Sequence, residues 1–309
     1  MAVTRAGGQA RRFRRIGRLT LAVTLAGLSV AVLSAQGGDV PHRVMNVAAK
    51  RGSDFEALLA DVARADVVFV GEQHQHAGTH RLELALLEGL ARRRRDVIVA
   101  LEMFDRDVQD PLEHFLMGHL SEAEFRAAAR PWPGYATDYK PLVDFAIARG
   151  WPVVAANAPR ALVEEVARNG LEVLSTKSDA ERAFVAREIR CPTGDAYFKR
   201  FQEAQGAGAL RVDGAYFAQC LRDETMGETI AQVLTAGAAG GKRPLVVSIN
   251  GAFHTAFGQG VVERTRRRLP DKRLLVIAIV PVENLDALTT EISDPPRADY
   301  IVYVRLKQT

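Results

Sequence analysis

Two Gly-x-x-His turns each follow an apolar run that is typical of a strand, and a third such run leads into a glutamate. The three runs are 67–70, 97–101 and 245–249. In parallel α/β sheets the loops beyond the carboxyl ends of the strands bind ligands and metals. We therefore expect four side chains to meet at one edge of one sheet, although they lie far apart in the sequence. They are Glu72, His74, Glu102 and His254.

Two histidines and two carboxylates suit a divalent transition metal, such as zinc, manganese, iron or nickel. Alternatively, Glu72 or Glu102 acts as a general base beside a metal-bound water. A structural interpretation competes with both, in which His254 caps a turn and Glu102 binds nearby backbone N–H groups. The remaining candidate histidines follow the first motif or lie in a helical region, and a lone surface histidine is usually only solvated. They are His76, His80, His114 and His119.

The sequence lacks the motifs of several other catalytic and binding chemistries. The chain has no Gly-x-Ser-x-Gly motif for a serine nucleophile and no Walker loop or Gly-x-Gly-x-x-Gly for a nucleotide. It also has no Cys-x-x-Cys for a thiolate zinc site or covalent haem attachment. In an exported protein its two cysteines, Cys191 and Cys220, can pair, but only their geometry decides this.

The first 35 residues differ in composition from the rest of the chain. They are rich in arginine, contain no acidic residue and include the apolar stretch 19–33, which is short for a membrane span but right for a signal peptide. We expect 1–35 to be a signal peptide or, alternatively, a membrane anchor, with 36–52 as a linker. No cysteine follows the apolar stretch, which excludes lipid attachment there. The predicted location is the periplasm or a membrane surface.

The basic character of the chain comes from this segment. Removing its six arginines from the formal net charge of +4 leaves −2. The isoelectric point of about 9.2 is therefore no sign of nucleic-acid binding, and we expect no nucleic-acid partner.

From residue 53 to 309 the chain alternates strand-like and helix-like patterns, as in α/β proteins. We expect a mostly parallel central sheet flanked by helices, in a single domain. Helical segments at about 107–150 and 160–236 should form a lid over the carboxyl edge of the strands. The last apolar run, 300–304, is expected to form the final strand, which could be antiparallel and lie at an edge of the sheet. The expected strands are 67–70, 97–101, 152–156, 245–249, 274–280 and 300–304.

Five short motifs together resemble a known family, the ChaN-like haem-binding uptake proteins. These are grouped with the Tiki and TraB proteins and the erythromycin esterases. The resemblance spans about residues 50–285 and implies an α/β core with a helical lid, an exported location and a role in iron acquisition. It also implies a homodimer that holds haem between subunits with tyrosine as iron ligand, and an outer-membrane uptake system as partner. The motifs are 71–74, 101–104, 156–160, 219–226 and 250–254.

The resemblance also implies roles for individual residues. The wider group implies a metal-dependent hydrolase centre at Glu72, His74, Glu102 and His254. For haem iron Tyr216 is the first candidate and Tyr135 and Tyr139 compete with it, while aromatic packing is the structural alternative for all three. Arg160 could bind a propionate, Asn157 could orient a site group or cap its helix, and Asp223 could belong to the site or pair with Arg222. The predicted ligand-binding residues are Tyr216, Arg160, Asn157, His76 and Asp223.

We therefore predict an exported haem-binding protein that takes part in haem and iron uptake. The alternative is a metal-dependent hydrolase of a peptide, ester or amide, because haem capture alone gives no reason for two glutamates beside two histidines.

Overall fold

The computed structural model describes residues 40–206, 212–288 and 296–306. The predicted signal peptide, 1–35, and residues 36–39 of the predicted linker lie outside this part of the chain. In the ranges described, no helix is both long enough and apolar enough to cross a membrane.

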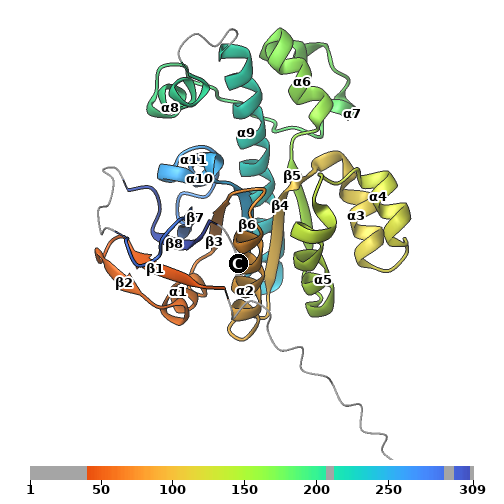
Figure 1. The fold of residues 1–309 in the computed structure, drawn as a ribbon. Coiled ribbons are helices and arrows are strands. Elements are labelled where there is room, and N and C mark those ends of the chain that lie inside the picture. Colours follow the sequence, from red (N-terminus) through yellow and green to blue (C-terminus); the bar gives the residue numbers. More distant parts are fainter. Residues whose placement is uncertain (1–39, 207–211, 289–295, 307–309) are drawn as a thin grey trace, which may run out of the picture. The chain divides into compact units, whose positions relative to one another are not determined.

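An eight-stranded sheet forms the centre of the fold, with the strand order β2-β1-β8-β7-β3-β6-β4-β5 (Figure 1). The six strands from β8 to β5 run parallel to one another, whereas β1 is antiparallel to both of its neighbours. This confirms the predicted α/β class with a mostly parallel sheet flanked by helices. The strands are β1 His42–Asn46, β2 Arg51–Ser53, β3 Val67–Glu72, β4 Val97–Asp105, β5 Val153–Asn157, β6 Leu245–Gly251, β7 Leu274–Val282 and β8 Tyr300–Arg305.

Helices cover both faces of the sheet and extend beyond the carboxyl ends of its strands. The α-helices are α1 Phe55–Val62, α2 Ala77–Ala91, α3 Gln109–Leu116, α4 Glu122–Ala129, α5 Lys140–Arg149, α6 Arg160–Asn169, α7 Asp179–Arg182, α8 Ala196–Gln205, α9 Val212–Gly237, α10 Ala252–Thr255 and α11 Val261–Arg268. Shorter helical segments are η2 Arg106–Val108, η3 Tyr135–Tyr139, η4 Leu171–Thr176, η5 Ala239–Gly241 and η6 Ala256–Gly258.

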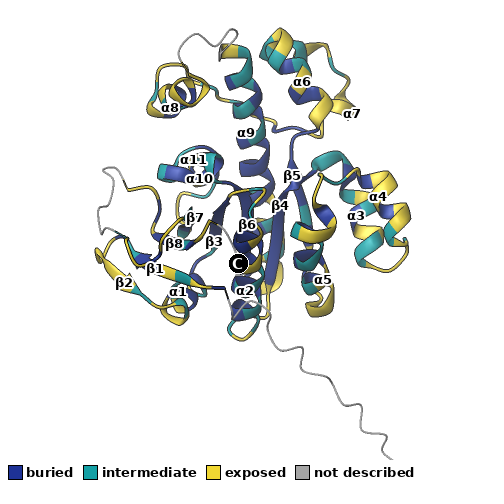
Figure 2. Cartoon of the chain, viewed as in Figure 1, coloured by how far each residue is buried: buried dark blue, intermediate teal, exposed yellow. Residues whose placement is uncertain are grey.

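The apolar runs form central strands because both of their faces are buried. Successive side chains of a strand point to opposite faces of the sheet. In β3, Val68 and Val70 pack with residues of α1, α2 and α5, whereas Val67 and Phe69 pack with residues of α9 and α11. Figure 2 shows the central strands as buried. Continuous rather than alternating apolar runs follow from this double cover.

Two predictions for the edge of the sheet are wrong. The predicted linker, 36–52, contains residues 42–46, which form β1, and its last two residues begin β2 at 51–53; β1 pairs with β8. The strand at 300–305 is therefore not at an edge, because β7 flanks it in parallel and β1 in antiparallel orientation. The partner of β1 lies more than two hundred residues away, so no local pattern reveals this pairing.

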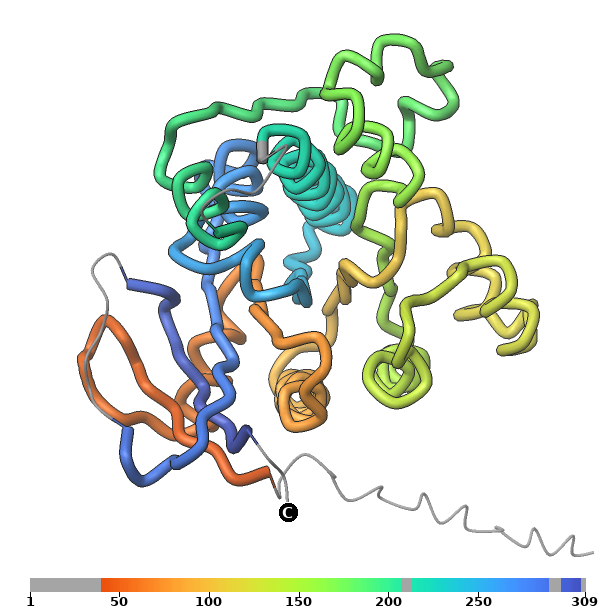
Figure 3. Tube along the Cα trace, turned by 45° about the horizontal axis from the view of Figure 1, so that its top comes forward, coloured from red at the N-terminus to blue at the C-terminus, as the bar shows by residue number. Residues whose placement is uncertain are grey.

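The predicted lid is only partly a lid. Helix α5 packs on the sheet through Leu142, Val143 and Ala146, and the second half of α9 does so through Met226 and Ile230. In contrast, α6, α7 and α8 lie beyond the carboxyl ends of the strands, where the first half of α9 also extends (Figures 1 and 3). The segments predicted as lid thus contribute both to the layers that flank the sheet and to the cover above its edge.

Candidate functional site

The strand order brings the predicted site residues to one edge of the sheet. Strand β6 lies between β3 and β4, so the carboxyl ends of these three strands are neighbours. Across this edge Glu102 of β4 accepts a hydrogen bond of 2.7 Å from the backbone N–H of Gly251, at the end of β6. The four predicted residues therefore share one edge, where they form two pairs: Glu102 with His254 and Glu72 with His74.

Glu102 and His254 belong to a buried network with two further side chains. The Nε2 atom of His254 lies 3.3 Å from Oε1 of Glu102, and its Nδ1 atom lies 2.7 Å from Oδ1 of Asp223. Tyr197 of α8 donates its hydroxyl to the other oxygen of Asp223 over 2.5 Å. Asp223 thus pairs with His254, and the described ion pairs include none between Asp223 and Arg222.

The two carboxylates hold His254 as a cation. Burial lowers the pKa of His254, but the charges of Glu102 and Asp223 outweigh burial and raise this pKa to about 10. Burial raises the pKa of Glu102, and the charge of His254 outweighs it and lowers the pKa to about 2. A doubly protonated imidazole has no lone pair for a metal. In this arrangement both ring nitrogens of His254 face carboxylates, and a metal-ligand role would require the ring to lose a proton.

The second pair, Glu72 and His74, lies in the wall of a cavity. The Nδ1 atom of His74 contacts Oε1 of Glu72, which also accepts a 2.8 Å hydrogen bond from the hydroxyl of Tyr139. Burial lowers the pKa of His74, but the hydrogen bond to Glu72 and nearby carboxylate charge raise it overall. The other nitrogen, Nε2, lies beside Gly251, since a Cβ atom at this glycine would be only 2.6 Å from it. Among the described residues no hydrogen bond to Nε2 is present.

The cavity beside His74 has a volume of about 460 Å³, within the range of small-molecule sites. Its wall combines the imidazoles of the two pairs with aromatic rings and two guanidinium groups. The imidazole, aromatic and guanidinium side chains among the lining residues are those of His74, Arg200, Phe201, Phe253, His254 and Arg297. Arg200 is fixed in the wall, because its guanidinium lies 4.1 Å from the ring centre of Phe253 and donates to the carbonyl of the same residue.

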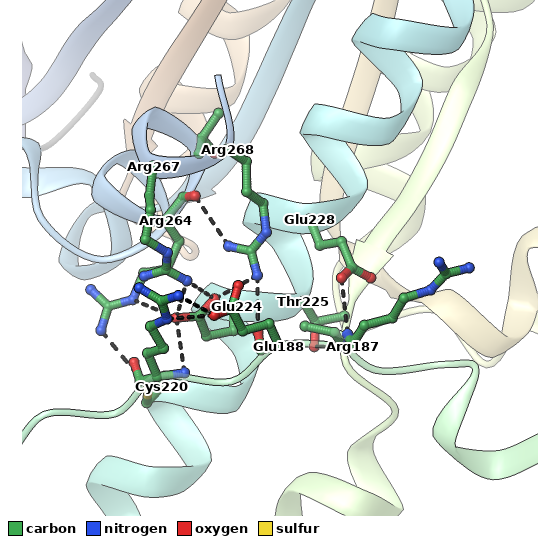
Figure 4. Close-up of polar contacts among 12 residues, drawn as sticks. Arg187, Glu188, Cys220, Glu224, Thr225, Glu228, Arg264, Arg267 and Arg268 are labelled. Carbon is green, nitrogen blue, oxygen red and sulfur yellow. Dashed lines mark hydrogen bonds and ion pairs between the residues drawn. The ribbon is translucent and has the colours of Figure 1, made fainter. Parts of the chain in front are cut away.

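Helix α9 places Asp223 in the site, and arginines of α11 hold this helix. The next residue, Glu224, is fully buried. It accepts hydrogen bonds from Arg267 and Arg268, each 2.7 Å from Oε2, and Arg264 lies 3.8 Å away. Figure 4 shows these arginines converging on Glu224. A buried carboxylate needs such partners, so this cluster fixes the register of α9 against α11.

A disulfide ties the cover to the same helix. Cys191 and Cys220 are bonded, which decides the pairing that the sequence left open. The segment 183–195, which precedes α8, also bonds to α9 where the N–H of Arg187 donates to Glu228 over 2.9 Å (Figure 4). Covalent and hydrogen bonds thus attach this segment to the helix that carries Asp223.

The remaining predicted ligand-binding residues lie outside the cavity wall. Tyr216 is buried among aromatic rings and donates its hydroxyl to the carbonyl of Pro192 over 2.7 Å, so it would have to give up this bond to bind iron. Asn157 donates to the carbonyl of Glu102 and so holds the end of β4, while His76 accepts from the N–H of Thr79 as the N-cap of α2. Arg160 lines a different cavity of about 290 Å³.

Sequence reasoning missed several residues of the site. Tyr197 and Arg200 come from a helix without any distinctive motif, and Tyr139 was expected as an iron ligand or in aromatic packing, not as a partner of Glu72. One signal was available, because His80 and Glu83 are three residues apart and so lie on one face of a helix. In the part of the chain that the structure describes, the one group of three metal-type side chains with ligand atoms within 4.8 Å of one another is Glu72, His80 and Glu83.

The chain is similar to known proteins in sequence and in fold. A family model described as haem-binding uptake, Tiki superfamily, ChaN matches residues 58–265. A solved structure described as cofacial heme binding to ChaN of Campylobacter jejuni has a TM-score of 0.59 at 16% identity and covers 85% of this chain and 97% of that chain. At this identity the likeness establishes the fold alone.

A curated relative, the chloroplastic protein RETICULATA-RELATED 5 of Arabidopsis thaliana, is 24% identical over 275 residues. The match covers 82% of this chain and 36% of the relative. The chain thus spans little more than a third of that protein's length.

Proposed function

Because the chain belongs to the ChaN haem-binding uptake family of the Tiki superfamily, we propose that it binds haem in the cavity beside His74. The main support for this proposal is the hydrogen-bonded pair of His74 and Glu72. A metal-binding histidine usually donates its other ring N–H to a carboxylate or carbonyl, which fixes the ring and makes it a stronger ligand. Here Nδ1 contacts Glu72, Nε2 lies beside Gly251, and both His74 and Gly251 line the cavity.

The other groups of the cavity wall fit the rest of a haem group. Phe201 and Phe253 offer apolar contact to a porphyrin, and Arg200 and Arg297 offer guanidinium groups to its propionates. Haem iron accepts a histidine nitrogen as axial ligand, and the protein tunes this iron through the ligand and its hydrogen bonds. We therefore assign iron ligation to His74 rather than to Tyr216, whose hydroxyl is already bonded to Pro192.

The proposal includes a role in haem and iron uptake by an exported protein. Two observations support this role: the family's description as uptake proteins, and the basic, then apolar, composition of residues 1–35. The solved ChaN of Campylobacter jejuni, described as binding haem cofacially, supports haem as the ligand. The homodimer and the outer-membrane partner implied by the resemblance stay predictions.

A haem titration followed by the Soret band tests the proposal. We expect saturable binding, and His74→Ala should weaken it by at least about tenfold because the iron loses its axial ligand. The exposed His114 provides the matched control, and His114→Ala should bind as the unmodified chain does. Tyr216→Phe decides between the two iron ligands. If this variant loses haem while His74→Ala retains it, His74 is not the ligand.

A second function, hydrolysis, is favoured by the buried network of Glu102, His254, Asp223 and Tyr197. Haem capture does not require this network, whereas acid–base catalysis depends on titratable groups held by such neighbours. In this function the cationic His254 donates a proton to a leaving group in the cavity.

A panel of ester and peptide substrates, assayed with and without added Mn²⁺, Co²⁺ or Zn²⁺, tests the second function. Turnover that disappears in His254→Gln while haem binding persists would support it. Absence of turnover across the panel would leave haem binding as the function of the site.

A further inference from the structure

A second cluster of potential ligands lies behind the cavity, on the side of Glu72 that faces α2. His80 and Glu83 of this helix point back to Glu72, and the three residues are 5%, 0% and 1% exposed, respectively. The Nδ1 atom of His80 lies 3.0 Å from Oε2 of Glu83 and 3.7 Å from Oε2 of Glu72. An imidazole nitrogen thus faces two carboxylates in a water-poor interior.

The two ring nitrogens of His80 have different neighbours: Nε2 faces a backbone carbonyl, and Nδ1 faces the carboxylates. The Nε2 atom lies 2.9 Å from the backbone carbonyl of His74. A carbonyl oxygen only accepts, so Nε2 carries a hydrogen; a ring without a second hydrogen then presents the lone pair of Nδ1 to Glu72 and Glu83. In that tautomer, Nδ1 and one oxygen of each carboxylate face one another, and a positive species between them would remove their mutual repulsion.

Two carboxylate oxygens in this cluster have no hydrogen-bond partner. They are Oε2 of Glu72 and Oε1 of Glu83, and both are fully buried. A buried polar atom without a partner costs about 1–3 kcal/mol, so native structures rarely leave one unexplained. Oε2 of Glu72 is also the oxygen that lies nearest Nδ1 of His80. A partner for this oxygen would therefore lie between the two side chains.

We propose that Glu72, His80 and Glu83 bind one divalent transition metal ion, such as Zn²⁺ or Mn²⁺. With metal–ligand distances of about 2.1 Å and tetrahedral angles, ligand atoms lie about 3.4 Å apart. The observed separations of 3.0 and 3.7 Å bracket this value. One nitrogen and two carboxylates suit zinc, manganese or iron, whereas calcium requires six to eight oxygen ligands.

The surroundings resemble the outer shell of a metal site. Tyr139 donates to the other oxygen of Glu72, and the carbonyl of His74 fixes the ring of His80. Such partners orient the ligands of a metal and raise its affinity. The proposed ion would hold Glu72 from behind while Glu72 holds His74 at the cavity, but its binding does not depend on haem. It also differs from the predicted set of four, of which it uses only Glu72.

A proton is the competing occupant. Burial raises the pKa of Glu83 well above its usual value, and the charge of Glu72 adds to this effect. A protonated Glu83 would donate a hydrogen bond to Glu72 and so remove part of the repulsion. The experiment must therefore distinguish a bound metal from a shared proton.

Metal content of the full chain provides the first test. The protein is stripped with a chelator, dialysed against Zn²⁺, Mn²⁺ or Co²⁺ and measured by elemental analysis without haem. We expect one equivalent of at least one metal, and affinity reduced at least about tenfold in Glu83→Gln and His80→Ala. Glu88→Gln on the same helix and His254→Ala should retain the metal. Retention by Glu83→Gln and His80→Ala, or absence of metal from the unmodified chain, would overturn the proposal.

Anomalous diffraction from crystals of the unmodified protein, grown with the metal that binds, provides a test that needs no variant. It remains decisive if the buried substitutions prevent folding. We expect a peak within coordination distance of Glu72, His80 and Glu83. A peak between Glu102 and His254 instead, or none in a protein that has bound metal, would assign the ion elsewhere. Neither result bears on haem binding, which the Soret titration measures separately.

Discussion

Replacement of His254 by glutamine should remove much of the dependence of folding stability on alkaline pH. In the folded chain the pKa of His254 is raised to about 10 from an ordinary value of 6.5. The folded state therefore keeps a proton that the unfolded state releases between these pH values. The resulting stabilisation is present in full below pH 6.5 and is lost as the pH rises through about 10.

The size of this effect follows from linkage. One pKa unit corresponds to about 1.4 kcal/mol, so the shift of His254 contributes up to about 5 kcal/mol to the folding free energy below pH 6.5 and about 4 kcal/mol at pH 7. Between the two pKa values the unmodified chain should lose about 1.4 kcal/mol of stability per pH unit from this group. The His254→Gln chain should lack this slope and should be less stable at neutral pH, since Glu102 and Asp223 then face each other without a cation.

The acid side should change in the opposite direction. The pKa of Glu102 is lowered to about 2, so its contribution is present above an ordinary value of 4.5 and is lost as the pH falls through about 2. In His254→Gln the cation that causes this shift is absent. The variant should therefore lack this loss of stability between pH 4.5 and about 2, which the unmodified chain should show.

Urea denaturation at several pH values, followed by circular dichroism, measures both slopes. His119→Gln is the matched control, because His119 is exposed. It should keep the alkaline slope of the unmodified chain. Equal alkaline slopes in His254→Gln and the unmodified chain would refute the reasoning, since His254 could not then be the group that stays protonated.

Three further predictions concern the cavity and the helix beside it. Gly251→Ala should weaken haem binding about tenfold, because the new methyl would lie 2.6 Å from Nε2 of His74 and displace the ring; unchanged Soret titrations would argue against ligation by this histidine. Reduction of the Cys191–Cys220 bond, which spans 29 residues, should lower the stability to urea by about 3 kcal/mol, and no change would contradict the pairing. Glu224→Gln should lower the free energy of unfolding by about 3 kcal/mol in the same assay, because it leaves buried arginine charge without its carboxylate. Replacement of the exposed Glu263 of α11 by glutamine serves as control.

Local patterns were sufficient for most elements of the fold. The six expected strands all occur, because each central strand needs an apolar run long enough to be buried on both faces. The two strands that were missed, β1 and β2, are short and partly exposed, so their sequence carries no such run. Their pairing with β8 depends on a distant segment, which no local pattern specifies.

The candidate site was predictable only in outline. Turns after parallel strands placed Glu72, His74, Glu102 and His254 at one sheet edge, because parallel strands end on the same side. The sequence did not reveal that they divide into two pairs. That division depends on the position of β6 between β3 and β4 and on Asp223, which α9 brings to His254 from the cover.

What the sequence by itself determined is the set of strands, the polar residues at their carboxyl ends and the family resemblance, because periodicity and motif order are properties of neighbouring residues. Only the tertiary structure decided which polar and charged side chains contact one another. It makes His254 a cation between two carboxylates, keeps Tyr216 bonded to a backbone carbonyl, and turns His80 and Glu83 toward Glu72. The physical reason is that pKa values and ligand sets depend on distances of a few ångströms between segments that the chain brings together only when it folds.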